Sequence, residues 1–251
     1  MVLGVRVHLT KMSQVMQRIE ERVGRRERCH YIVATQMHGI MEACRDPSYT
    51  EVLNSADLFV PDGISLTLAA RLRGIKGASR VPGPDLFIEG CRLAEDRGFR
   101  VYFYGDTDDT LTELASTLKQ RFPELRIAGA HSPPFRPLTK CEDDNVVREI
   151  NLSEADIVWV GLGAPKQERW MFEHRDKLQA PVLVGVGAAF KFSSGLVKRA
   201  PAWVGKLGLE WLWRLIQEPS RVWRRLIIDW PQFAFRVILE CLNSKKLGKP
   251  K

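Results

Sequence analysis

The sequence predicts an α/β fold, a mostly parallel sheet flanked by helices in a Rossmann-like arrangement, followed by a C-terminal helical appendage. Up to about residue 197, short β-rich apolar runs alternate with helical patterns, which is the signature of a parallel sheet covered by helices. After that point the alternation stops and a basic, Trp-rich segment follows. We therefore expect an α/β domain over residues 1–197 and a helical appendage over residues 198–251.

Apolar runs rich in β-branched and aromatic residues predict the strands of the sheet. They are YIVAT (31–35), DLFV (57–60), RVYFYG (100–105), RIAGAH (126–131), DIVWVG (156–161) and PVLVGVG (181–187). A shorter run, VRVHL (5–9), is expected to open the chain as a further strand.

Helical patterns lie between these runs, with apolar residues at every third or fourth position. The clearest are SQVMQRIEERV (13–23), SLTLAARLRG (65–74), DLFIEGCRLAEDRG (85–98) and DDTLTELASTLKQRF (108–122). The segment SPPFRPLTKCEDDN (132–145) is rich in proline and polar residues, so it predicts a loop.

The composition is that of an ordinary globular protein and argues against several other classes. Apolar residues make up 45% and charged residues 27% of the 251 residues. The five cysteines are odd in number and scattered, which indicates neither a disulfide framework nor a zinc site, and we expect a reducing cytoplasmic location. Neither a signal peptide nor a run of 18 apolar residues is evident, so we do not expect a membrane-spanning protein.

Positive charge is concentrated in the C-terminal segment. The chain has a net charge of +8, and residues 201–251 hold ten Lys or Arg against four acids, together with five of the seven tryptophans. Basic residues interleaved with Trp suit an anionic membrane surface, where the indole ring lies at headgroup level. Nucleic acid is the competing partner for a basic segment, but no recognisable nucleic-acid motif supports it.

Polar and glycine-rich segments follow five of the predicted strands, at the edge where ligands bind in open α/β sheets. These segments are Thr35, then PDG with Asp62, GDTDD beginning at Gly105, GLGAPKQE with Gly163 and Gln167, and GAAFKFSSG with Lys191. A single segment of this kind would be weak support. Five of them at one edge of a sheet predict a binding site.

The segment VGLGAPKQERW (160–170) is the best candidate for a phosphate contact. Its glycines allow backbone amides to approach an anion, and Pro165 is expected to begin a helix whose N-terminus favours phosphate. An ordinary strand-to-helix turn is the alternative. The dinucleotide fingerprint G-x-G-x-x-G is absent because position 166 is Lys, which disfavours a nicotinamide-dependent dehydrogenase.

Three other features carry a structural and a functional interpretation. Asp62 in LFVPDGIS is either a turn residue or a working carboxylate. Arg80 in ASRVPGPDLF is either solvated or a phosphate clamp, and Asp85 is expected to be a helix N-cap. The segment 199–230 predicts two helices, and its arginines could reach lipid headgroups or a substrate diphosphate. Four histidines are given structural roles, namely His8, His30, His131 and His174, whereas His38 lies near the predicted site without an evident partner.

Over nearly its whole length the chain resembles the WecG/TagA/CpsF family of bacterial glycosyltransferases. The resemblance rests on an ordered set of residues and motifs: Thr35, PDG with Asp62, RVPGPDL with Arg80, GLGAPKQE with Gln167, GVGAAF, and RAPAWVGKLGLEWLWRLIQEPSR. Any one of them is weak, but the series with these spacings is highly specific.

The resemblance implies an inverting enzyme that transfers a sugar from a UDP-sugar to a saccharide linked to undecaprenyl diphosphate, without a metal or other cofactor. It implies a cytoplasmic protein attached peripherally to the inner face of the plasma membrane through residues 200–251 and acting in cell-surface polysaccharide synthesis. The sequence leaves the oligomeric state open between a monomer and a homo-oligomer. Asp62 matches the proposed general base, and Thr35, Arg80 and Gln167 match pocket residues. Arg214, Arg221 and Arg224 fall where arginines of the appendage close the site.

Two positions depart from the family pattern. Met37 stands where Asn is common, and Lys191 stands where Asp is common. Both lie in donor-pocket segments, so a donor other than an N-acetylmannosamine nucleotide, such as a glucosyl or other hexosyl donor, stays open. A membrane-associated binding subunit that has lost catalysis is a further alternative, which the presence of Asp62, Arg80 and Gln167 argues against.

Overall fold

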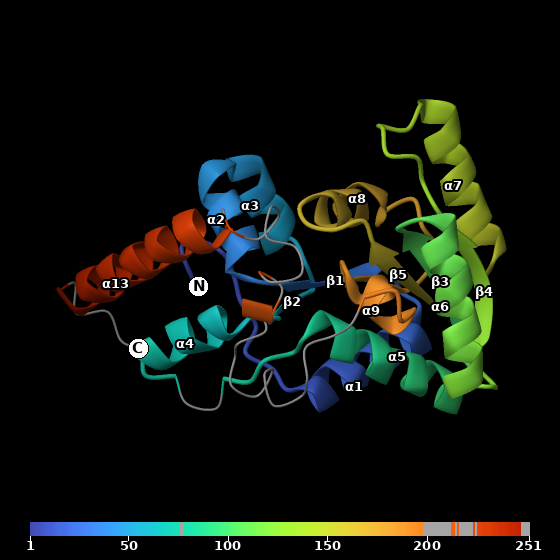
Figure 1. Cartoon of the computed structure of the whole chain (residues 1–251), viewed down its shortest axis with the longest axis horizontal. Coiled ribbons are helices and arrows are strands. Elements are labelled where there is room, and N and C mark those ends of the chain that lie inside the picture. The colour runs from blue at the N-terminus through green and yellow to red at the C-terminus, as the bar shows by residue number, and fades with distance from the viewer. Residues whose placement is uncertain (76–77, 198–211, 214, 216–222, 224, 247–251) are drawn as a thin grey trace.

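A computed structural model describes residues 1–75, 78–197, 212–213, 215, 223 and 225–246. Within these ranges, six parallel strands form one sheet in the order β2-β1-β6-β5-β3-β4, and helices cover both of its faces (Figure 1). The strands are β1 (His30–Thr35), β2 (Leu58–Pro61), β3 (Arg100–Gly105), β4 (Arg126–His131), β5 (Ile157–Gly161) and β6 (Val182–Gly185). This confirms the predicted α/β class, and each of the six long apolar runs contains a strand.

One face of the sheet is covered by α2 (Met37–Arg45), α3 (Pro47–Asn54), α7 (Lys140–Leu152) and α8 (Lys166–His174). Tyr31 and Val33 of β1 point to this face, because side chains alternate along a strand. They pack in one buried cluster with Ile40 of α2 and Met171 of α8. Each fully buried side chain of this size contributes about 1.5–3 kcal/mol to folding.

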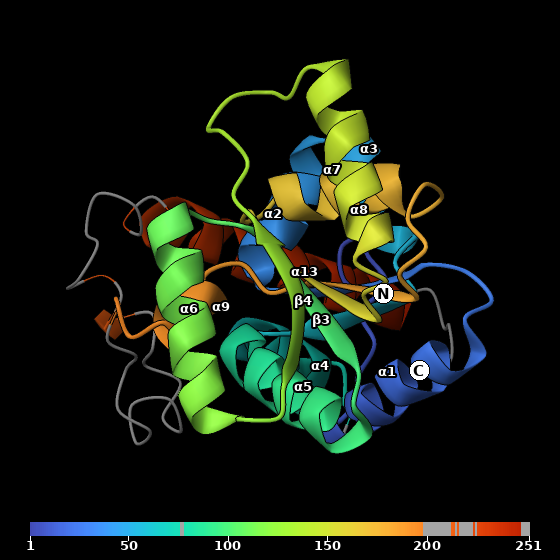
Figure 2. The same cartoon turned by 90° about the vertical axis from the view of Figure 1, so that its right-hand side faces the viewer.

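The opposite face is covered by α1 (Met12–Arg25), α5 (Gly83–Arg97), α6 (Asp108–Arg121) and the short α9 (Ala189–Ser193) (Figure 2). Phe87 of α5 lies at its centre, with its ring edge-to-face against Trp159 at 5.1 Å and Phe190 at 5.4 Å between ring centroids. Trp159 approaches α5 so closely that a methyl group at Gly90 would meet its ring at 2.3 Å. This packing requires glycine at that position.

Local sequence explains where several helices begin. Thr107 caps α6 through its hydroxyl, and Thr139 and Glu142 form a reciprocal capping box at the start of α7. Two predictions at helix starts were wrong. The segment 132–145 is a loop only as far as Thr139, because this capping box begins a helix within it. Asp85 lies in the first turn of α5, whose N-cap is Pro82.

The predicted opening strand over residues 5–9 was also wrong. Only an isolated bridge between Val2 and Val5 forms there. His8 nevertheless runs beside the sheet edge, where its backbone N–H donates to the Phe59 carbonyl at 2.8 Å and its Nδ1 accepts from the Phe59 amide at 3.0 Å. The imidazole of His8 therefore accepts the hydrogen bond from Phe59 that a backbone carbonyl of a neighbouring strand would otherwise accept.

The described part of the C-terminal segment consists chiefly of η1 (Arg225–Asp229), a π-helical turn, and α13 (Trp230–Lys246). Phe233 and Val237 of α13 are buried in the same cluster as α2 and α8. Most of the two helices predicted over residues 199–230 lies outside the described residues, and the division at residue 197 stays a prediction. None of the helices in the described ranges is long and apolar enough to cross a membrane.

Candidate active site

The carboxyl ends of five strands bring the predicted segments to one edge of the sheet. Following the strand order, the segments after β2, β1, β6, β5 and β3 lie in sequence along this edge. The helix after β1 packs on one face and the helix after β6 on the other, since Met37 and Phe190 belong to the opposite clusters. A crevice opens at such a switch point in open α/β sheets. Asp62 follows β2, which is the neighbour of β1 in the sheet.

Asp62 is half-buried and held on both of its carboxylate oxygens. Gln36 Nε2 donates to Oδ2 at 3.0 Å, and the Gly83 backbone amide donates to Oδ1 at 3.1 Å. The Asp62 backbone amide donates to the Thr35 carbonyl at 3.1 Å, which ties the ends of β1 and β2 together. The side chain therefore has a fixed orientation, and Gly63 forms the N-cap of α4 (Ile64–Leu72) directly after it.

The loop that carries Arg80 is fixed to the end of β2, the strand that Asp62 follows. The Val81 amide donates to the Pro61 carbonyl at 2.8 Å, and Ser79 Oγ donates to the Thr10 carbonyl at 3.0 Å. Gly83, two residues after Val81, approaches the backbone of Val186, which follows β6. A methyl group at Gly83 would lie 3.2 Å from the Val186 carbonyl oxygen. This loop therefore spans the edge from β2 to β6.

Gln167 joins the segments that follow β5 and β6. It is 2% exposed, and its Oε1 accepts from the Gly163 amide at 3.2 Å and from the Gly187 amide at 2.9 Å. Gly163 and Gly187 both have positive φ angles, 77° and 54°, which favour glycine. Gln167 was predicted to contact substrate. In the structure its oxygen holds the two glycine segments in place, and its contact with substrate stays a prediction.

Glu168, the next residue, is completely buried. Its Oε1 accepts from Gln167 Nε2 at 2.9 Å, whereas its Oε2 and the nearby Tyr49 hydroxyl lack well-formed hydrogen bonds in the described structure. Burial raises the pKa of Glu168 and so favours its neutral form. The sequence did not single out this residue, because a Glu in the first turn of a helix is ordinarily exposed.

The end of β3 forms the far side of the edge. Gly105 has a φ of 120°, and a methyl group there would lie 2.7 Å from the Gly161 carbonyl carbon, so β3 and β5 approach closely. Asp106 follows, with its side chain 4% exposed. Its Oδ1 accepts from Thr110 Oγ1 at 3.0 Å and lies 3.7 Å from Lys191 Nζ. Lys191 is thus placed at the predicted site, paired with a buried carboxylate.

Thr35 and Met37 are buried at the start of α2. Thr35 is 6% exposed, and its Oγ1 would lie 2.8 Å from a methyl group at Gly39, so its side chain packs under the helix. Met37 is 8% exposed and belongs to the core cluster. The predicted residues Arg214, Arg221 and Arg224 lie outside the described residues.

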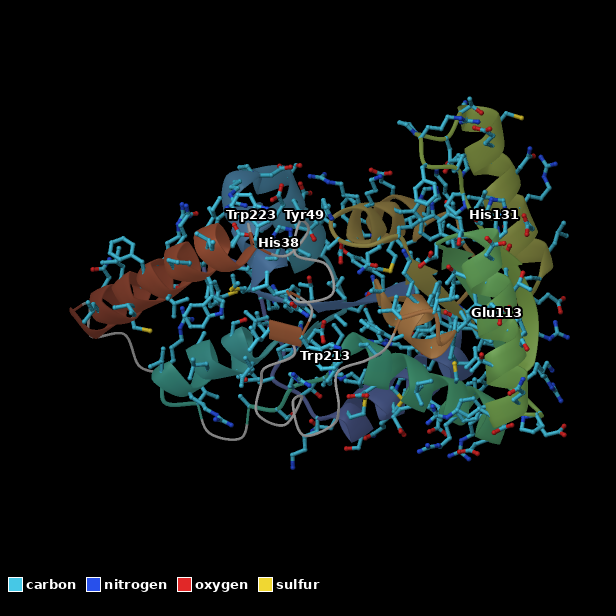
Figure 3. All side chains as sticks on the ribbon, in the orientation of Figure 1. His38, Tyr49, Glu113, His131, Trp213 and Trp223 are labelled. Carbon is cyan, nitrogen blue, oxygen red and sulfur yellow. The ribbon has the colours of Figure 1, made fainter. Side chains whose placement is uncertain are left out.

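His38 has a hydrogen-bond partner, Asp229, that the sequence did not reveal. His38 is labelled in Figure 3. Its Nδ1 lies 2.8 Å from Asp229 Oδ2, and Arg45 Nη2 donates to Asp229 Oδ1 at 2.5 Å. Burial alone would raise the pKa of Asp229, but the hydrogen bonds from Arg45 and His38 hold it below its usual range. The contact joins η1 to α2, 191 residues away in the chain, and such a distance gives no local sequence signal.

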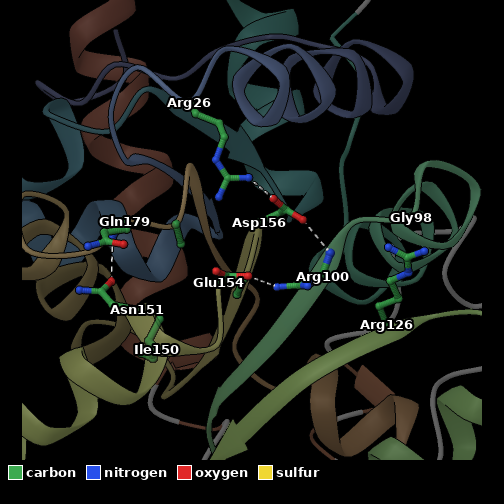
Figure 4. Close-up of a pocket in the computed structure, with 11 residues that line it drawn as sticks. Arg26, Gly98, Arg100, Arg126, Ile150, Asn151, Glu154, Asp156 and Gln179 are labelled. Atoms are coloured by element: carbon green, nitrogen blue, oxygen red, sulfur yellow. Dashed lines mark hydrogen bonds and ion pairs between the residues drawn. The ribbon is translucent and has the colours of Figure 1, made fainter.

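A hollow of about 470 Å³ lies at the opposite end of the sheet, beside the start of β3 (Figure 4). Arg26 donates to Asp156 at 2.5 Å there, and Arg100 pairs with Glu154. These arginines are therefore occupied by acids of the chain itself. The hollow is separate from the strand ends that carry the predicted residues.

Comparison with known proteins decides the family. A family model described as the WecG/TagA/CpsF family of glycosyl transferases matches residues 1–247. The chain belongs to this family. A relative in Bacillus subtilis (strain 168), named N-acetylglucosaminyldiphosphoundecaprenol N-acetyl-beta-D-mannosaminyltransferase, is 34% identical over 203 residues, or 81% of this chain and 77% of the relative. A protein of the same name in Staphylococcus aureus (strain MW2) is 29% identical over 246 residues, or 98% and 94% of the two chains.

The glycosyltransferase shows, within its described residues, no group of three or more His, Cys, Asp or Glu side chains arranged to hold a metal ion. The sequence analysis did not single out Gln36, and it named the segments that contain Gly83, Gly187 and Asp106 without giving these residues a role. The four residues hold Asp62, Gln167 and Lys191 in place. Gln36 and Asp106 each come directly after a predicted strand, so their position was the available signal.

Proposed function

We propose that this family member is an inverting glycosyltransferase that moves a sugar from a UDP-sugar to a saccharide linked to a polyprenyl diphosphate in bacterial cell-surface polysaccharide synthesis. One observation carries the proposal. Asp62 is held on both oxygens at the carboxyl edge of the sheet, at the end of β2, which pairs with β1 beside the switch point. The relatives are named as transferases to N-acetylglucosaminyldiphosphoundecaprenol, which supports a lipid-linked acceptor of that class.

Asp62 acts as the general base in this proposal. It accepts the proton of the acceptor hydroxyl while that oxygen attacks the anomeric carbon, and UDP leaves from the opposite face. Each carboxylate oxygen can accept more than one hydrogen bond, so the bonds from Gln36 and Gly83 do not by themselves prevent Asp62 from accepting that proton. Such assistance typically contributes about 10² to 10⁴ in rate.

The leaving diphosphate needs positive charge or backbone amides. Glycine segments at Gly163 and Gly187 lie at this edge of the sheet, and α8 begins at Lys166, three residues after Gly163. Arg80 and Lys191 lie at the same edge, and Arg214, Arg221 and Arg224 are further candidates from the appendage. Because charge-assisted bonds to phosphate are roughly twice as strong as neutral ones, we propose that these side chains, without a bound metal, neutralise the diphosphate.

Residues 200–251 attach the enzyme peripherally to the inner face of the plasma membrane in this account. They contain ten basic residues and four acids, together with five tryptophans, and this composition favours binding to an anionic lipid surface. The acceptor would be embedded in that surface. Attachment at the membrane would therefore bring the base to its substrate.

The identity of the donor sugar is open between two classes. The names of the relatives support N-acetylmannosamine. Lys191, paired with Asp106, is the feature that favours another hexosyl donor, since the family commonly has Asp at this position.

A panel of UDP-sugars, offered with a lipid-linked N-acetylglucosamine diphosphate acceptor and scored for UDP release, tests the function. We expect acceptor-dependent release with one donor, unaffected by EDTA. Release by none of the donors would contradict the enzymatic proposal and favour a binding subunit. Activity that disappears on chelation and returns with Mg²⁺ or Mn²⁺ would contradict diphosphate neutralisation by side chains alone.

A further inference from the structure

Helix α4 exposes a row of large apolar side chains directly after the proposed base. Ile64, Leu68 and Leu72 recur every four residues, so they lie on one face of the helix, and Ile75 follows its end. All four are exposed, by 43%, 44%, 59% and 44%. The other face of α4 is buried through Leu66 and Ala69. An outward apolar row of this length is unusual for a surface helix.

Helix α13 has a second outward row. Its inner face is buried through Phe233 and Val237, yet the outer face exposes Phe235, Ile238, Leu239 and Leu242, which recur at helical spacing. A helix with apolar side chains on both faces normally has a neighbour on each. In the described structure the outer row of α13 remains exposed.

The two helices lie next to each other at one end of the molecule, beyond the β2 edge (Figure 1). Arg73, the C-cap of α4, forms an ion pair with Glu240 of α13. Glu240 also accepts from the Leu3 amide at 3.1 Å. The contact fixes the two rows relative to each other.

The charges around these rows suit an anionic partner. From Gly63 to Pro84 the chain has four basic residues and no acid. On α13 and η1, both acids are paired with bases of the chain: Glu240 with Arg73, and Asp229 with Arg45 and His38. Arg71 and Arg236 are exposed beside the apolar rows. Apolar side chains with basic residues between them match the boundary of anionic headgroups and acyl chains.

From this charge pattern we propose that α4 itself enters the bilayer interface together with α13, so that the α/β domain, and not only the appendage, contacts lipid. The inference rests on the proposed attachment at the membrane and extends it to a helix that begins two residues after Asp62. The row on α4 then places the base close to the headgroup level. There it meets an acceptor whose diphosphate is fixed at the lipid surface.

The test compares Leu68→Gln/Leu72→Gln with Leu152→Gln, a control at an exposed leucine at the end of α7. Binding is measured by cosedimentation with vesicles of phosphatidylglycerol and phosphatidylcholine. We expect the double variant to bind about tenfold or more weakly, because two exposed leucines lose their contact with lipid, and the control to bind normally. Amide exchange with vesicles present should show protection of residues 64–75 and of α13, and none in α7.

Several outcomes would overturn the inference. Protection of α13 without protection of α4, with normal binding of the double variant, would confine the contact to the appendage and leave the proposed function intact. Unchanged vesicle binding together with a changed sedimentation coefficient would assign the rows to a second copy of the chain. If the wild-type chain itself does not bind these vesicles, both the inference and the proposed attachment are wrong.

Discussion

The amide nitrogen of Gln36 lies 3.0 Å from Oδ2 of Asp62 and joins the first residues after two neighbouring strands. Gln36 follows β1 and Asp62 follows β2, so the parallel pairing of Thr35 with Pro61 brings them together. A carboxylate that must accept a proton from one direction needs such a fixed orientation. Gln36 is therefore a positioning residue for the proposed base.

Replacing this amide should slow transfer without unfolding the protein. In Gln36→Leu the carboxylate loses one of its two described hydrogen bonds, and we expect kcat to fall roughly tenfold to a hundredfold because the base is no longer held in place. UDP release under saturating donor and acceptor measures this. Gln17→Leu, on the exposed surface of α1, is the matched control. Equal rates for the two variants would remove Gln36 from the mechanism.

Gln167 should affect donor binding and stability together. Gln167→Leu removes the acceptor shared by the amides of Gly163 and Gly187, and leaving them unsatisfied should cost about 1–3 kcal/mol in the free energy of unfolding. The loosened glycine segments should raise KM for the donor. Urea unfolding and donor titration check both effects, with the exposed Gln179→Leu as control. A lower stability with an unchanged donor KM would show that these segments do not contact the donor.

Asp229 should stabilise the contact between η1 and α2 in a pH-dependent way. The pKa of Asp229 is lower in the folded protein than in the unfolded chain. Its contribution to the free energy of unfolding is therefore present above the unfolded pKa of about 3.9 and is lost as pH falls through the folded pKa. Asp229→Asn should therefore unfold at a lower temperature than wild type at pH 7, and the difference should shrink below about pH 4. A difference in Tm that is constant from pH 7 to pH 3 would contradict this.

Lys191 should matter for the donor far more than for stability. Its side chain is 40% exposed and its nitrogen is 3.7 Å from the buried Asp106, which keeps its hydrogen bond from Thr110 without the lysine, so we expect the pair to contribute about 1 kcal/mol or less. Lys191→Ala should therefore change Tm little, whereas KM for the UDP-sugar should rise several-fold. Lys119→Ala, on α6, serves as a distant lysine control. An unchanged donor KM would exclude a contact between Lys191 and the donor.

The sequence predicted the sheet more completely than it predicted the site. Buried strands are uninterrupted apolar runs, so β3 was predicted with its correct ends. The ends of β4, a strand at the edge of the sheet with no fully buried residue, were also predicted correctly. Side-chain contacts at the strand ends depend on which strands are neighbours. The bond between Gln36 and Asp62, like that between His38 and Asp229, joins residues far apart in sequence and left no periodic signal. The motif GLGAPKQE identified Gln167 in the sequence, but its hydrogen bonds with Gly163 and Gly187 could be seen only in the folded structure.

The central claim is that Asp62 is the base of a glycosyl transfer. The most direct test is the turnover of Asp62→Asn with a UDP-sugar and a lipid-linked acceptor, together with donor affinity by calorimetry. We expect kcat to fall by about 10² to 10⁴ while the donor Kd stays close to that of wild type, because the amide keeps the shape of the side chain but cannot accept the proton. Turnover close to the wild-type rate would contradict the account.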